Sequence, residues 1–208
     1  TAATSHSLAA SLSRRIATFG PLTVAEYMAA ALTDPEHGYY IAQQPFGHEG
    51  DFITAPEVSQ MFGELLGLWA AVTWQAMGEP GEIHLIELGP GRGTLMADAL
   101  RAAAVVDGFL SATEAHLVET STSLQKRQRS NLSTLDVPLT WHQRFDQVPK
   151  APLLIIANEF LDALPVRQFV RTNDGWAERC VGLDDAGTGL VWIDLPTYAP
   201  PNLPATSA

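Results

Sequence analysis

The chain has 208 residues, of which 46% are hydrophobic and 17% are charged, so it is too apolar for a disordered segment. Its 12 basic and 23 acidic residues give a formal net charge of -11, which argues against nucleic acid as a partner because few phosphates could be neutralised. The single cysteine, Cys180, excludes an internal disulfide and a multi-thiolate metal site. No apolar run approaches the ~20 residues that span a bilayer, so we expect no membrane insertion.

Residues 1–80 predict a helical N-terminal portion. Thr1 to Phe19 are rich in Ala and Ser, include basic residues but no acid, and weakly resemble a transit peptide. Thr23-Val-Ala-Glu26 is a capping box, and it predicts a helix that ends before Asp34-Pro35. A second capping box, Thr54-Ala-Pro-Glu57, predicts a helix that ends near Gly78. The large apolar side chains of this second helix, expected in a core or an interface, are Met61, Phe62, Leu65, Leu66, Trp69, Val72 and Trp74.

A long polar segment, Gly38 to Ile53, separates these two helices. It contains Pro45, Gly47 and Gly50, and it is too polar for a core and too long for a simple turn. Because loops of this length often carry function, we expect it to contribute to a binding site.

Residues 81–165 alternate between apolar strands and helices, which predicts an α/β core. Fully apolar strands that alternate with helices indicate a doubly wound, mostly parallel sheet with helices on its faces. The predicted strands are Ile83 to Leu88, Ala115 to Glu119, Leu139 to His142 and Leu153 to Ala157. The predicted helices are Thr94 to Val105 and Ser121 to about Leu132.

Residues 166–195 predict a different structure, an antiparallel ribbon. The segments Val166 to Arg171, Trp176 to Leu183 and Gly189 to Ile193 have the composition of strands. The turn residues Asn173-Asp-Gly175 and Asp184-Asp-Ala-Gly187 separate these segments, and such turns are typical of hairpins. The proline-rich residues 196–208 predict a disordered tail.

The segment Glu87-Leu-Gly89-Pro-Gly91-Arg-Gly93 follows the first strand of the core and opens a helix. Glycines at that turn let a ligand approach the backbone amides and the positive end of the helix. A nicotinamide fingerprint needs Gly or Ala at position 94, where this chain has Thr94, and it does not require the acid at Glu87. The pattern therefore favours S-adenosylmethionine, whose ammonium and sulfonium are cationic, with a purely structural turn as the alternative.

Acidic and amide side chains follow two other core strands. Glu119 ends the second strand, where a carboxylate can accept hydrogen bonds from the two hydroxyls of a ribose. Asn158, Glu159 and Asp162 follow the fourth strand and would form an acidic pocket in the same crevice. A solvated strand end for Glu119, and a capping or ion-pairing role for Asp162, are the alternatives.

Three motifs resemble those of the MidA family of S-adenosylmethionine-dependent methyltransferases. They are Gly50 to Glu64, Glu87 to Met96 and Asn158 to Pro165, within a match from Leu22 to Ile193. The resemblance implies a Rossmann-like methyltransferase fold and S-adenosylmethionine as cofactor. It also implies a protein arginine as acceptor in mitochondrial members, with a respiratory complex I subunit as one candidate partner. The implied cofactor-binding residues are Asp51, Thr54, Glu87, Gly89, Gly91, Gly93 and Glu119, and the implied active-site residues are Asn158, Glu159 and Asp162.

An arginine acceptor would keep its charge, because the pKa of a guanidinium exceeds ~12. Glu159 and Asp162 are then expected to hold it by bidentate hydrogen bonds and to accept a proton as the methyl group arrives. A non-catalytic, cofactor-binding assembly factor is the main alternative, and a nicotinamide oxidoreductase is a third. The six histidines are scattered without a His-Glu-x-x-His motif, so no metal site is expected.

Members of the resembled family continue past the point where this sequence stops, so we expect the methyltransferase core to lack strands. The resemblance also sets the expected location, which is the cytoplasm of a bacterium or the mitochondrial matrix of a eukaryote.

Overall fold

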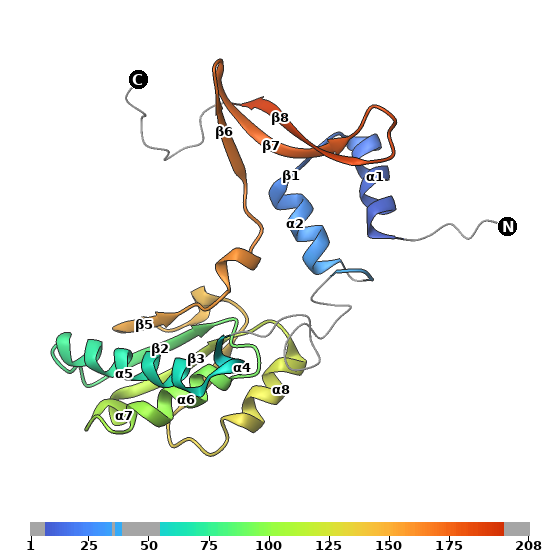
Figure 1. Cartoon of the computed structure of the whole chain (residues 1–208). Coiled ribbons are helices and arrows are strands. Elements are labelled where there is room, and N and C mark those ends of the chain that lie inside the picture. The colour runs from blue at the N-terminus through green and yellow to red at the C-terminus, as the bar shows by residue number, and fades with distance from the viewer. Residues whose placement is uncertain (1–6, 35, 39–54, 198–208) are drawn as a thin grey trace. The chain divides into compact units, whose positions relative to one another are not determined.

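The computed structural model describes residues 7–34, 36–38 and 55–197, and the chain divides into two compact units (Figure 1). The parallel-sheet unit comprises residues 45–162, and the ribbon unit comprises residues 1–44 with 163–208. Each unit has its own hydrophobic core, and each is described by itself. No helix among the described residues is both long enough and apolar enough to cross a membrane.

The parallel-sheet unit contains a four-stranded sheet in the order β4-β3-β2-β5, in which every neighbouring pair is parallel. The predicted α/β fold with a parallel sheet is therefore confirmed. The strands are β2 (Ile83–Leu88), β3 (Thr113–Val118), β4 (Leu139–His142) and β5 (Leu153–Ile156). The helices are α4 (Ala55–Val58), α5 (Gln60–Ala76), α6 (Thr94–Ala103), α7 (Phe109–Ala112) and α8 (Thr122–Asn131), with the 3-10 turns η1 (Phe145–Gln147) and η2 (Leu161–Ala163).

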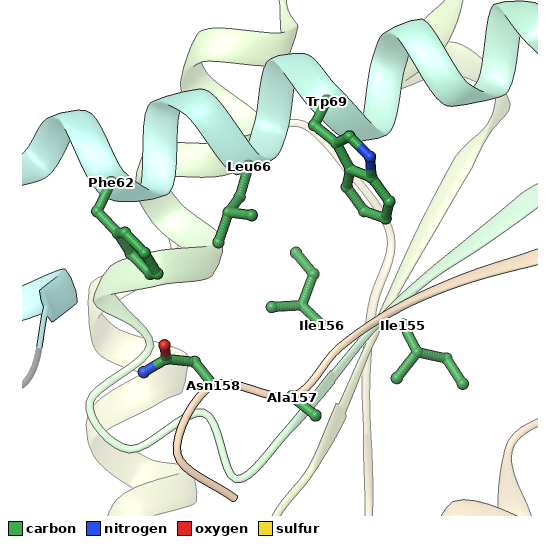
Figure 2. A pocket seen from close by; sticks show the side chains of 7 residues that line it. All are labelled: Phe62, Leu66, Trp69, Ile155, Ile156, Ala157 and Asn158. Carbon is green, nitrogen blue, oxygen red and sulfur yellow. The ribbon is translucent and has the colours of Figure 1, made fainter.

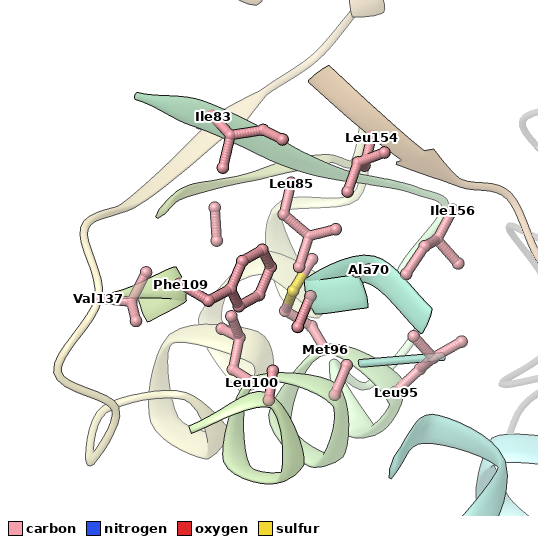
Figure 3. Close-up of a cluster of buried hydrophobic side chains, with 14 of the residues drawn as sticks. Ala70, Ile83, Leu85, Leu95, Met96, Leu100, Phe109, Val137, Leu154 and Ile156 are labelled. Carbon is pink, nitrogen blue, oxygen red and sulfur yellow. The ribbon is translucent and has the colours of Figure 1, made fainter. Parts of the chain in front are cut away.

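The core of this unit lies between the sheet and its helices (Figure 3). Ile83 and Leu85 project from β2 toward this core, and both are fully buried. Phe109 packs edge-on against Trp74, with ring centroids 5.6 Å apart, and the Trp74 indole N–H donates to the Pro80 carbonyl at 2.9 Å. The prediction that Trp74 is a core residue is thus confirmed.

Helix α5 packs against α6 through its small residues, which differs from the predicted apolar stripe. The buried face of α5 consists of Gly63, Gly67, Ala70, Ala71 and Trp74. Four of the large side chains expected in a core or an interface are instead 48% or more exposed in this chain, namely Met61, Leu65, Trp69 and Val72. The predicted buried face of α5 was wrong in part, because apolar periodicity selects the face with the largest hydrophobic side chains. Two helices can approach closely only through small residues.

Close approach at Gly67 leaves no room for a side chain. A methyl group built there would overlap the backbone carbonyl of Ala99 on α6. At Gly63 it would lie 2.7 Å from the Asp98 Cβ atom. This contact groups α4 and α5 with the parallel sheet, although the sequence analysis placed them in the N-terminal portion, residues 1–80.

The ribbon unit is built around one long strand. β7 (Gly175–Leu183) pairs antiparallel with β6 (Gln168–Thr172), β8 (Leu190–Thr197) and the short β1 (Leu22–Thr23). The predicted antiparallel ribbon is confirmed. Because β8 extends to Thr197, residues 196 and 197 belong to a strand rather than to the predicted tail, and residues 198–208 lie outside the described part.

Two helices complete the ribbon unit. α1 (Leu8–Phe19) was not predicted, and it buries Leu12 and Ile16 in a cluster with Leu22 and Val181. The helix α2 (Val24–Thr33) begins at the predicted capping box, in which the Glu26 amide donates to Thr23 Oγ1 at 3.2 Å and the Thr23 amide donates to Glu26 Oε2 at 2.9 Å.

We expect Gly67→Ala to lower the free energy of unfolding by ~1–3 kcal/mol, because the added methyl group must push α5 away from α6. This loss exceeds the gain in helix propensity, which is ~1 kcal/mol. Gly81→Ala is the matched control, since no atom lies within 4 Å of the added Cβ there. Urea unfolding of both variants measures the difference, and equal midpoints would contradict the close contact.

Candidate functional site

Three predicted site segments meet at one edge of the parallel sheet. The glycine turn, residues 89–93, follows β2, which ends with Glu87 and Leu88; Glu119 follows β3; and the segment Asn158 to Asp162 follows β5. Because the strands are parallel and β2 lies between β3 and β5, the carboxyl ends of all three share an edge, with the glycine turn in the middle. Ligands of open α/β sheets bind at this edge.

The glycine turn depends on backbone conformations that favour glycine. Gly89, Gly91 and Gly93 have φ values of 64°, 54° and 82°, all in the left-handed region. The Gly89 amide donates to the Val118 carbonyl at 3.0 Å, which ties the turn to the end of β3. Gly93 is the N-cap of α6 and has no side chain to cap the helix. The N-cap residue therefore supplies no oxygen to the amino end of α6, and the positive end of this helix is suited to an acceptor supplied by a ligand.

Glu87 lies beneath this turn and is only 3% exposed. Its carboxylate accepts a hydrogen bond from the Met96 amide in the first turn of α6, which lowers its pKa, but burial dominates and raises the pKa to about 8. The Oε2 atom has no hydrogen-bond partner among the described residues. A buried carboxylate oxygen without a donor is destabilising, so this position is suited to a donor or a cation brought by a ligand.

Gln128 of α8 connects the glycine turn to Glu119. Its Nε2 atom donates to the Gly91 carbonyl at 2.8 Å and lies 3.4 Å from Glu119 Oε2. Its Oε1 atom accepts from the indole N–H of Trp141 at 2.8 Å. Gln128 has no exposed surface, so its amide is committed entirely to these three partners. The two segments that the sequence analysis assigned to one ligand are therefore held together by a single side chain.

Glu119 has spare capacity for hydrogen bonds. Its Oε1 atom accepts from the Ser121 amide at 2.8 Å, and its Oε2 atom faces Gln128. A carboxylate offers about four lone-pair positions, and the Ser121, Gln128 and Thr120 donors take up to three of them, so at least one stays available for a ribose hydroxyl. Burial raises the pKa of Glu119, against the opposing effects of the hydrogen bonds from Ser121, Gln128 and Thr120. The residues present thus fit a nucleoside.

Glu57 of α4 also holds the glycine turn, and sequence reasoning assigned it only to a capping box. Its carboxylate accepts from Thr94 Oγ1 at 2.8 Å and from the Arg92 guanidinium at 3.2 Å. Asn131 of α8 donates to the Arg92 carbonyl at 2.9 Å on the same turn. The turn is therefore held by side chains from α4 and from α8.

The segment after β5 contributes one residue to a pocket and two exposed carboxylates. Asn158 is half-buried, whereas Glu159 and Asp162 are exposed. The Glu159 backbone has φ 46°, a conformation that is strained for a side chain other than glycine, asparagine or aspartate. The 3-10 turn η2 begins at Leu161, so Asp162 lies within it and Glu159 lies before it. The two carboxylates therefore do not lie on one face of a single helix.

Phe160, in the same segment, packs against the glycine turn. A Cβ atom built on Gly89 would lie 2.5 Å from the Phe160 Cδ2 atom, so only glycine fits beneath this ring. The sequence contained no signal that assigned this aromatic residue to the site, because a lone phenylalanine after a strand is usually a core residue.

A pocket of about 340 Å³ lies between α5 and β5 (Figure 2). Phe62, Leu66 and Trp69 line it from α5, and Ile156 points toward them from the strand. Asn158 is the one predicted site residue that lines it, and neither the glycine turn nor Glu119 does so. The predicted cofactor residues Asp51 and Thr54 lie outside the described residues.

We expect Gln128→Leu to destabilise the parallel-sheet unit by ~2–4 kcal/mol, because it leaves the Gly91 carbonyl, the Glu119 carboxylate and the Trp141 N–H without their partner. Gln60→Leu is the control, since Gln60 is exposed and contacts only Glu64. Thermal unfolding followed by tryptophan fluorescence measures both, and a Gln128 variant as stable as the control would refute the role of this amide.

The raised pKa of Glu87 makes stability depend on pH. Deprotonation costs more in the folded chain than in the unfolded chain, so stability falls as the pH rises from about 4.5 to about 8. Glu87→Gln should remove most of this fall, leaving the smaller contribution of Glu119. Urea unfolding at pH 5, 6, 7 and 8 gives the slope of the free energy of unfolding against pH for each protein. Equal slopes for the variant and the original chain would contradict the raised pKa, because ionisation of Glu87 would then cost the folded chain little.

Comparisons with known proteins agree with this geometry. Residues 65–206 match the model of a family of S-adenosyl-L-methionine-dependent methyltransferases. The mitochondrial protein arginine methyltransferase NDUFAF7 of Danio rerio is 40% identical over 199 residues, which are 86% of this chain and 47% of that protein. The human protein of the same name is 41% identical over 82% of this chain and 44% of its own length.

A solved structure from Burkholderia thailandensis, with S-adenosyl-homocysteine bound, superposes with a TM-score of 0.73 at 35% identity, covering 91% of this chain and 50% of that one. The chain thus spans about half the length of the relatives that it matches. On these sequence and structural matches, the chain belongs to the MidA-like family of S-adenosylmethionine-dependent methyltransferases.

Proposed function

We propose that the chain binds S-adenosylmethionine at the carboxyl edge of the parallel sheet and takes part in methylating an arginine side chain of a protein. The observation that carries this proposal is the pair of hydrogen-bond contacts from Gln128 to Gly91 and to Glu119, at 2.8 and 3.4 Å. These two contacts hold the glycine turn beside a buried carboxylate. S-adenosylmethionine needs both features, because it joins a nucleoside to an amino acid.

Each part of the proposed site suits one part of the cofactor. The unpartnered oxygen of Glu87, which a cationic ammonium would favour in its ionised form, and the start of α6, which has no N-cap side chain, suit the ammonium and carboxylate groups of a methionine. The free lone-pair position of Glu119 suits a ribose hydroxyl. Phe160 offers an aromatic surface against Gly89 that excludes water from the turn. When bound, S-adenosylmethionine supplies the methyl group and the sulfonium leaving group.

The carboxylates of Glu159 and Asp162 are our candidates for holding the acceptor. Both are exposed, and the structure shows no hydrogen bond or ion pair from either side chain to another described residue, so both are available for a guanidinium. Two carboxylates can fix the planar fork of an arginine by paired hydrogen bonds. In such a methyl transfer, the main contribution of a protein is to hold the acceptor nitrogen in line with the bond between the methyl group and the sulfonium sulfur. A carboxylate in contact with that nitrogen can then accept the proton that is released.

The relatives support a protein acceptor, because several carry the name protein arginine methyltransferase and are described as mitochondrial. A respiratory complex I subunit is our more specific candidate for the partner. We also propose the mitochondrial matrix as the location in a eukaryote and the cytoplasm in a bacterium.

Two sets of variants separate cofactor binding from transfer. Glu119→Gln should weaken S-adenosylhomocysteine binding at least about tenfold, because a hydrogen bond to a charged group contributes ~1.5–3 kcal/mol. The double variant Glu159→Gln with Asp162→Asn should bind with unchanged affinity but transfer no methyl group. Calorimetry measures binding, and a radiolabel assay with arginine-containing peptides measures transfer.

Asp107→Asn with Asp136→Asn is the matched control, because it removes two exposed acids from the same unit at a distance in sequence from the site. It should change neither readout. Binding by the original chain without any transfer would favour the cofactor-binding assembly factor instead. Undiminished turnover by the Glu159 and Asp162 double variant would remove these two residues from the mechanism.

A further inference from the structure

The parallel sheet carries a cluster of histidines and a carboxylate on the face opposite to its core. Ile83 and Leu85 of β2 face the core, and His84 lies between them on the other face. In the strand register His84 is opposite Glu114, and His116 follows Glu114 by two residues on β3. These three side chains therefore lie on one face of the sheet, from two neighbouring strands.

The cluster is buried and its hydrogen bonds are incomplete. His84 and His116 are 1% and 2% exposed, and their ring centroids lie 4.3 Å apart. His84 Nδ1 and His116 Nε2 have no hydrogen-bond partner among the described residues. Buried ring nitrogens without partners are costly, and unpaired ones call for an explanation such as a bound ion.

The geometry around Glu114 shows what could satisfy the unpartnered His116 Nε2 atom, with His84 contributing its Nε2 atom rather than Nδ1. Glu114 Oε2 lies 3.9 Å from His84 Nε2 and 3.9 Å from His116 Nε2. One ligand atom from each of the three residues lies within 4.8 Å of the others. A carboxylate oxygen placed between two imidazoles at that separation is too far for hydrogen bonds, but it is close to the spacing around a tetrahedral ion.

The protonation of His116 favours a lone pair that faces the carboxylate. His116 Nδ1 lies 3.0 Å from His142 Nε2, so a proton on His116 Nδ1 can be donated to His142. That tautomer leaves the His116 Nε2 lone pair directed at Glu114. Metal-ligating histidines commonly donate their second ring N–H in this way.

We propose that His84, Glu114 and His116 form a binding site for a divalent transition-metal ion of the zinc class. Two imidazoles and a carboxylate are a donor set that zinc accepts, with a fourth position left for water or another ligand. Glu82 lies at the edge of this group, with its Oε1 atom 3.4 Å from His84 Nε2.

Closure around an ion requires movement of all three side chains. Metal–ligand bonds of about 2.0–2.2 Å place tetrahedral ligand atoms about 3.4 Å apart, so each 3.9 Å gap to Glu114 must shorten by about 0.5 Å. The ligand nitrogens of the two histidines, which lie within 4.8 Å of each other, must also approach by rotation of their rings. Glu114 can move because its side chain is 48% exposed. The ion would join β2 to β3 about 10 Å from the carboxyl edge, since His84 precedes Glu87 by three residues. This proposal is independent of the proposed methyl transfer.

The test is a titration of the 208-residue chain with Zn²⁺, in competition with a chromophoric chelator. We expect one equivalent to bind and saturating Zn²⁺ to raise the melting temperature, because the ion binds the folded chain preferentially. Glu114→Gln should weaken binding at least about tenfold and remove the shift. This half-exposed residue can lose its charge without loss of the fold, which circular dichroism verifies.

Glu36→Gln is the matched control. Glu36 and His37 are also a carboxylate and an imidazole, 3.8 Å apart, but both side chains are exposed, whereas the histidines of the cluster are buried. It should leave binding unchanged. His116→Gln is a second variant that removes a ligand nitrogen and retains a polar group of similar length. Substitution of Co²⁺ gives an independent readout, since a tetrahedral site has strong visible bands. Absence of one-equivalent binding, or the same affinity after Glu114→Gln, would overturn the proposal.

Discussion

The side-chain amide of Gln128 is the interaction on which the arrangement of the candidate site depends. It joins a backbone carbonyl of the glycine turn, the carboxylate that ends β3 and the indole of Trp141 on β4. Because the amide is completely buried, each of these contacts must be present, and none can be replaced by water. The strands and the turn are thereby fixed relative to one another before any ligand binds.

A fixed turn is needed because the glycine residues bring no rigidity of their own. Left-handed backbone at Gly89, Gly91 and Gly93 leaves α6 without an N-cap side chain. The same absence of side chains would let the turn move. Glu57 from α4 and Asn131 from α8 hold it through Thr94 and Arg92, so the turn combines an open amide surface with a rigid frame. Preorganisation of this kind lowers the entropy cost of binding.

Much of this arrangement could be predicted from the sequence. The burial of Ile83 to Glu87 follows from an apolar run that is bounded by Gly81 and Gly89, and parallel strands place their carboxyl ends together. That reasoning locates Glu119 beside the glycine turn without coordinates. The capping box at Thr23 and the turn residues at 173–175 likewise predict local structure, because they act over three or four residues.

The missed features depend on packing and register instead. Gln128 lies in a very polar helix, so only the tertiary structure shows that it is buried. The small face of α5 was passed over because Gly63 and Gly67 carry no apolar signal. His84, Glu114 and His116 come together only when β2 and β3 pair in one particular register. A shift of one residue would place His84 opposite Thr113 or Ala115, which face the core, so the sequence alone could not show the cluster.

The most direct test of the central claim is a crystal structure of this chain with S-adenosylhomocysteine. The account predicts that at least one ribose hydroxyl lies within hydrogen-bond distance of Glu119 and that the amino-acid part contacts the turn at residues 89–93, with Gln128 keeping its contacts to Gly91 and Glu119. A ligand bound elsewhere, with Glu119 making no hydrogen bond to it, would contradict the account.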